Sequence, residues 1–170
     1  MKRIYALALG AFGMAISTTL AAATPPFSYM TLNGTTRIAV AVDDVDRDFK
    51  VYGLDAAQVQ SQVTTQLIAA GVQVVPYATA VSEPDVGLLR VRVVTNHDAN
   101  GFYHMSVKLE LRHKIPLGNA AGGFISQAVW TDANNGVILT SEIEKIRSLV
   151  DELIGNFITE YRAQSSKSLP

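Results

Sequence analysis

Residues 86–115 have the sequence VGLLRVRVVTNHDANGFYHMSVKLELRHKI, and this stretch decides the fold. From Tyr103 to His113, apolar side chains alternate with polar or charged ones at nearly every position. Because strand side chains point alternately to the two faces of a sheet, this pattern predicts a strand with one buried and one wet side. Leu88–Val94 repeats the pattern, and the polar segment between the two, ending in Asn100-Gly101, favours a turn. The stretch is therefore predicted to form a long β-hairpin.

The wet face of this hairpin carries most of its charge. Shifting either strand by one residue would bury charged side chains, so the register is expected to be firmly set. We expect the helices to cover only the apolar face and to leave this face without an internal partner. The predicted interaction surface consists of Arg90, Arg92, Lys108, Glu110 and Arg112.

The segments before the hairpin predict a strand–helix–strand unit. Thr36–Val42 is a strand with small residues on one face, and Leu54–Ala70 is an amphipathic helix. Asp55 is expected to cap this helix in a capping box with Gln58, and Gly71 to end it. Because a helix connects them, the strand Val72–Val75 should lie parallel to the first strand, and the crossover should be right-handed. Tyr77–Asp85, which contains Pro84, is expected to be a loop.

The segments after the hairpin predict two short strands and a long helix. Phe124–Thr131 has strand character, Asn134-Asn135-Gly136 favours a tight turn, and Val137–Leu139 would return as a short strand. A helix of about twenty residues should begin at Thr140 or Ser141, since apolar residues then recur every three or four positions. The predicted fold class is α/β (α+β): a two-layer sandwich with a mixed, mostly antiparallel sheet and two helices on one face.

The ends of the chain predict export. Residues 1–23 have a basic start, an apolar run and small residues at the end, the features of a secretory signal peptide. An uncleaved membrane anchor is the alternative interpretation of this segment. We expect residues 24–35 to be a linker, 36–162 a single domain and 163–170 a disordered tail. The chain has no cysteine, which excludes disulfides and thiol catalysis. A periplasmic location is predicted, with release from the cell as the alternative, and no membrane span after cleavage.

Charge and motifs narrow the class of function. With 14 basic and 15 acidic residues, the chain lacks the basic footprint of a nucleic-acid-binding protein. A metal site could be built from His97, Asp98 and His104 near the turn, but surface histidines are the simpler interpretation. The acidic run 43–48 resembles a calcium loop, although Phe49 occupies the position that requires glycine. No serine lies in a nucleophile-elbow pattern, so we predict a non-enzyme without a cofactor.

The order of elements resembles a small domain of envelope proteins. The residues that carry this resemblance are Arg37–Val42, Gly71, Val72–Val75, Val107–Leu111, Trp130–Leu139, Leu149–Leu153 and Phe157-Ile158. Similar domains occur at the N-terminus of the Tol propeller protein, in curli-secretion lipoproteins and in lipoprotein activators of cell-wall synthases. The resemblance implies a non-catalytic domain that works by protein contact. This chain differs in lacking a cysteine that could carry a lipid.

The predicted function is therefore that of an exported interaction or envelope accessory module. Its partner would be an envelope protein or polymer that meets the basic hairpin face. Self-association through an open sheet edge is a further mode of assembly. The alternative function is a small-ligand or metal-binding protein that uses the loops at His97–Gly101 and Pro116–Gly123.

Overall fold

The computed structural model describes residues 32, 35–43, 45, 49–50, 53–116, 123–139, 142 and 144–165. The expected signal peptide lies outside these residues, as do most of the expected linker and the end of the tail. The described elements are, in order, β1 (Arg37–Val42), α2 (Ala56–Ala69), β2 (Gln73–Val75), α3 (Tyr77–Ser82), β3 (Gly87–His97), β4 (Tyr103–Pro116), β5 (Phe124–Ile138) and α4 (Glu144–Ser165).

The strands form one mixed sheet in the order β2-β1-β3-β4-β5. β1 pairs in parallel with both β2 and β3, while β3–β4 and β4–β5 are antiparallel. The predicted hairpin is thus confirmed, and so is the parallel strand–helix–strand unit that precedes it. At the hairpin turn, Gly101 has a φ of 87°, a conformation that glycine adopts without strain. The predicted α/β fold class is confirmed.

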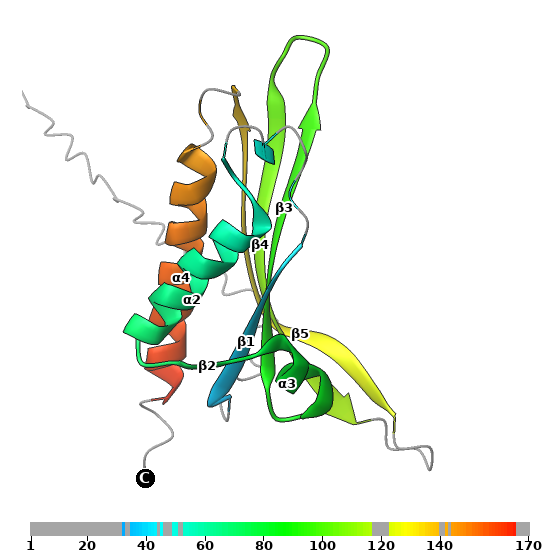
Figure 1. The fold of residues 1–170 in the computed structure, drawn as a ribbon, viewed down its shortest axis with the longest axis vertical. Helices are drawn as coiled ribbons and strands as arrows, with labels where there is room; N and C mark the ends of the chain where they lie inside the picture. The colour runs from blue at the N-terminus through cyan, green and yellow to red at the C-terminus, as the bar shows by residue number, and fades with distance from the viewer. Residues whose placement is uncertain are drawn as a thin grey trace, which may run out of the picture.

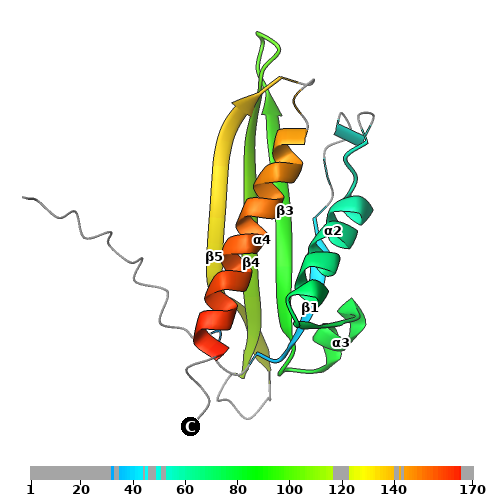
Figure 2. The same cartoon turned by 90° about the vertical axis from the view of Figure 1, so that its left-hand side faces the viewer.

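The two long helices, α2 and α4, cover one face of the sheet (Figure 2). Apolar side chains of β3 and β4 point toward them and have no exposed surface; these are Leu89, Val91, Val107, Leu109 and Leu111. Phe157 of α4 is also fully buried, and its ring meets Trp130 of β5 edge-on at a centroid distance of 5.0 Å. Burying each such side chain stabilises the fold by about 1.5–3 kcal/mol, so this layer holds the domain together.

The ends of α2 are built largely as its sequence predicts. The Asp55 carboxylate accepts a hydrogen bond from the Gln58 backbone N–H at 2.8 Å, and Gly71 follows the helix with a φ of 84°. A capping box also needs a return bond from the Gln58 side chain to the Asp55 backbone N–H, and the contacts of the described residues do not include it. The Gln58 side-chain oxygen instead accepts from Arg147 of α4 at 3.0 Å, so this residue ties the two helices together.

The third helix, α3, was not expected. Tyr77–Asp85 was predicted to be a loop, but Tyr77–Ser82 is helical. Ala80 is buried against Ala39 of β1 and Val86. The small side chain of Ala39 lets α3 approach the sheet on the face opposite α2 and α4, and Figure 1 shows α3 on the other side of β1 from those helices. The wet face is therefore partly covered at one end.

β5 is one continuous strand where the sequence predicted a strand, a turn and a short strand. Asn135 of the expected turn pairs with Ser106 of β4. The local preference for a turn is overridden because β4 pairs with β5 along its whole length, from Phe124 to Ile138. A bulge interrupts the pairing, since Leu111 faces Trp130 while Arg112 faces Ala128. Bulges bend strands, and Figure 1 shows the start of β5 and the end of β4 turning away from the helices.

Two residues of the expected linker are part of the folded domain. Leu32 belongs to the main core, and Thr35 is 3% exposed. The hydroxyl of Tyr161 in α4 donates to the Thr35 carbonyl at 2.7 Å, and Thr35 Oγ1 lies 2.7 Å from His113 Nε2 of β4. Thr35 therefore joins the last helix to the central sheet.

Candidate interaction surface

The five predicted surface residues lie together on the face of β3 and β4 that α2 and α4 do not cover. Arg92 is directly opposite Lys108 and Arg90 is opposite Glu110, so these side chains form one continuous group. We call Arg90, Arg92, Lys108, Glu110 and Arg112 the charged face. The strand alternation sufficed to place them together, and their role in binding stays a prediction.

Asp43 pairs with two of these cations. It directly follows β1, and its two carboxylate oxygens accept from Arg90 Nε at 2.7 Å and Arg92 Nε at 2.8 Å. Partial burial opposes ionisation, but the bonds from Arg90 and Arg92 outweigh that effect and hold the pKa of Asp43 below its ordinary value. In the sequence, Asp43 is only the first residue of the acidic run 43–48, and no local signal marks this pairing because its partners are distant in the chain.

Glu110 of β4 pairs with the other two cations of the charged face. Its side chain is only 12% exposed and contacts Lys108 at 2.5 Å and Arg112 at 3.2 Å. Burial raises the pKa of Glu110, but Lys108 and Arg112 more than compensate and leave it below the usual value. The expectation that this face has no internal partner is therefore wrong. Two carboxylates hold four cations in place and leave a positive excess.

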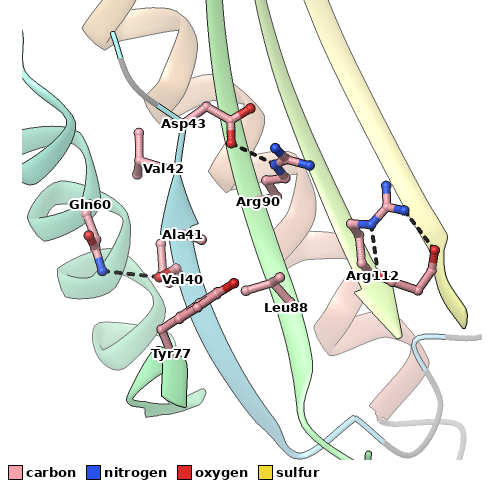
Figure 3. Close-up of a pocket in the computed structure, with 10 residues that line it drawn as sticks. Val40, Ala41, Val42, Asp43, Gln60, Tyr77, Leu88, Arg90 and Arg112 are labelled. Carbon is pink, nitrogen blue, oxygen red and sulfur yellow. Dashed lines mark hydrogen bonds and ion pairs between the residues drawn. The ribbon is translucent and has the colours of Figure 1, made fainter. Parts of the chain in front are cut away.

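A hollow of about 580 Å³ opens between the charged face and α3. Figure 3 shows Tyr77 of α3 on one side, Arg112 of β4 on the other, and Leu88 and Arg90 of β3 between them. Arg112 donates from Nε to Ser126 Oγ and from Nη2 to the Ser126 carbonyl of β5. The bent start of β5, before the bulge, thus helps to form the wall opposite Tyr77. Nothing in the sequence indicated this hollow, because α3 forms one of its walls and Tyr77–Asp85 was expected to be a loop.

The histidines of the proposed metal site do not converge as required. His104 Nε2 lies 3.6 Å from an Asp98 oxygen. His97, by contrast, lies opposite Tyr103, whose side chain is buried, and its ring contacts that of Tyr103. Asp98 is occupied by the backbone N–H groups of Asn100 and Phe102. Among the residues that the structure describes, no three side chains of the metal-binding types are placed to share an ion.

Two other predicted sites fall largely outside the described residues. In the acidic run, Asp44, Asp46 and Asp48 lie beyond them, as do residues 117–122 of the glycine-rich segment. None of the described helices is long and apolar enough to cross a membrane.

Comparisons with known proteins give distant similarities only. No family model matches the chain, and no curated protein does. A variant of PelC from Paraburkholderia phytofirmans, solved as a dodecamer, has 15% identity and a TM-score of 0.43, covering 77% of this chain and 91% of that one. A second PelC dodecamer structure from that organism has 16% identity and a TM-score of 0.33, covering 65% and 77%.

A minor lipoprotein from Acinetobacter baumannii is also similar, with 17% identity and a TM-score of 0.34, covering 79% of this chain and 94% of its own. Similarities this distant establish neither a family nor a function for the chain.

Proposed function

We propose that this chain is a non-catalytic accessory module of the cell envelope that binds an acidic partner through its charged face. The observation that carries the proposal is the arrangement of four cations around two carboxylates on the strand face that α2 and α4 leave uncovered. Asp43 and Glu110 fix the directions of the guanidinium groups, which lowers the entropy lost when a partner binds. A fixed, net-positive surface on a chain with a formal charge of −1 favours a partner with negative charge.

The contacts also support a non-catalytic role. The hydroxyl–imidazole pair of Thr35 and His113 resembles a nucleophile with its base, but Thr35 is buried and joins α4 to the sheet. The cations of the charged face can only donate hydrogen bonds, and the guanidinium groups of its three arginines stay charged at every physiological pH. Such a set binds anions and does not by itself transfer protons.

Charge reversal tests this proposal. The double variant Arg90→Glu/Arg92→Glu and the wild type are used to capture partners from an envelope extract, and bound proteins and polymers are identified by mass spectrometry. Reversal places like charges against the partner, so recovery should fall by about tenfold or more. Recovery by the wild type should also fall with added salt.

The matched control reverses two charges on α4, in Lys145→Glu/Arg162→Glu. This variant should retain the partner, provided that circular dichroism shows both variants folded. Equal recovery by the wild type and by Arg90→Glu/Arg92→Glu would refute the role of the charged face. Fractionation of the producing cells, with N-terminal sequencing of the exported chain, tests the periplasmic location and the signal peptide separately.

We further propose that two copies associate through the open edge of β5. This strand has 15 residues, of which only Asp132 is charged, and Phe124, Ile125 and Val137 are about half exposed. Natural proteins usually protect such an edge with charges or a covering element. Sedimentation of the wild type should show a dimer, and the double variant Ile125→Lys/Val137→Lys should be monomeric. The control Ile68→Lys, at a similarly exposed site on α2, should remain dimeric. A wild type that stays monomeric at high concentration would refute the association.

A further inference from the structure

We propose that the hollow beside α3 binds the carboxylate of an acidic sugar, such as one uronic acid unit of a polysaccharide. This inference rests on the proposed function, since Arg90 and Arg112 belong to the charged face, and it names the chemistry of the partner. The volume of about 580 Å³ lies in the range of small-ligand pockets. Its lining combines cations, an aromatic ring and small polar groups, as seen in Figure 3.

The two guanidinium groups supply the site for the carboxylate. Arg112 pairs in register with Leu88, two residues before Arg90 on β3. Diagonal neighbours of this kind are about 7–8 Å apart at their backbones, which lets two long side chains reach one anion. The described hydrogen bonds of Arg90 use only Nε, so its terminal amino groups remain to make the paired bonds that arginine forms with carboxylates.

Asp43 does not repel such a ligand strongly, because both of its oxygens already accept from arginines. Glu110 is in the same position, with its two oxygens contacting Lys108 and Arg112. The hollow therefore presents donors whose directions are set before a ligand arrives. Preorganised donors raise affinity because little side-chain freedom remains to be lost.

The remaining lining residues favour a sugar ring over a bare anion. Tyr77 lines the hollow and is 53% exposed. Its ring can contact the apolar C–H face of a sugar. Ser126 Oγ accepts from Arg112, so its hydroxyl hydrogen is available to a ligand hydroxyl. Gln60 donates from Nε2 to the Val40 carbonyl, which leaves its side-chain oxygen as an acceptor.

Calorimetric titration with trigalacturonate, with neutral trigalactose as the comparison, tests this inference. The wild type should bind the acidic trimer and not the neutral one. Tyr77→Ala and Arg90→Lys should each weaken binding by about tenfold, since one removes the ring and the other the second donor of the fork. Tyr77 is exposed and is the first residue of α3, so its loss should leave the fold intact.

Lys145→Gln/Arg162→Gln on α4 is the matched control, because it removes two cations that neither belong to the charged face nor line the hollow. It should bind the trimer nearly as well as the wild type. Absence of binding to the wild type, or equal weakening by this control and Tyr77→Ala, would overturn the inference. Equal affinity for inorganic phosphate or for an oligoglutamate peptide would also overturn it, in favour of a general anion site. In each case the proposed function survives if Arg90→Glu/Arg92→Glu still loses the envelope partner.

Discussion

The two faces of β4 are made by alternate residues of one strand, yet they are built by different interactions. Leu109 is fully buried under the helices, whereas its neighbour Lys108 lies on the charged face and contacts Glu110. On the inner face, close packing of apolar groups stabilises the fold. On the outer face, paired charges contribute little to stability but hold donors in fixed positions. The inner face therefore maintains the domain, while the outer face carries the cations that we propose bind a partner.

The largest expected effect comes from substituting neighbours on β4. Leu109→Ala should lower the free energy of unfolding by about 2–5 kcal/mol, since it removes buried methyl groups and leaves a cavity. Lys108→Ala should change it by no more than about 0.5 kcal/mol. Urea denaturation followed by circular dichroism measures both. Similar losses for the two variants would show that the charged face also maintains the fold.

A smaller effect is expected from Asp43→Asn, which removes the charge that pairs with Arg90 and Arg92. All three side chains are partly exposed, so solvent screening limits the loss of stability to about 1 kcal/mol. The Nε–H resonances of both arginines should shift in NMR spectra, since they lose a charged acceptor. Asp85→Asn, which alters the exposed pair with Arg37, is the control and should leave those resonances unchanged. Unshifted arginine resonances in Asp43→Asn would contradict the pairing.

The smallest effects are expected from pH, and the two faces should respond in different windows. Burial lowers the pKa of His113 below its ordinary value of 6.5. The unfolded chain therefore takes up this proton first, and stability falls as the pH drops below about 6.5. His113→Gln should flatten this part of the profile, measured as thermal unfolding against pH.

The two carboxylates that pair with the cations of the charged face act at lower pH. The pKa values of Asp43 and Glu110 are held below their ordinary values of 3.8 and 4.5. Their contribution to stability is complete above those ordinary values and is lost as the pH falls through the lowered ones. The loss of stability at low pH should persist in His113→Gln and should be smaller in Asp43→Asn. A single transition shared by all variants would contradict the assignment.

Sequence patterns predicted what depends on neighbours in the chain. Alternation placed Leu109 and Lys108 on opposite faces, and Asp55 and Gly71 marked the ends of α2. The patterns failed where distant pairing overrode local preference. Asn134-Asn135-Gly136 favours a turn, but β4 holds it extended. Tyr77–Ser82 was expected to be a loop because the fit of Ala80 against Ala39 cannot be seen locally.

Prediction of the candidate interaction surface also fails where distant segments of the chain meet. All five residues of the charged face follow from alternation, since period two requires only the strand itself. Asp43 does not, because its partners Arg90 and Arg92 are brought to it by the pairing of β1 with β3. The hollow also requires α3 and the bend of β5. Its existence therefore depends on contacts between segments that the sequence does not place next to each other.

The position of β1 has a consequence for the order of folding. β1 is the first of the described strands to be made, yet it lies between β2 and β3 in the sheet. Its partner β3 follows only after two helices and another strand, whereas β3, β4 and β5 pair with their immediate neighbours. Closing long loops slows folding, so we expect the β3–β5 meander to form first and β1 to be inserted late. Until then, the edge of β1 that will pair with β3 stays open. A chaperone that binds early segments of the chain would reduce aggregation through this edge.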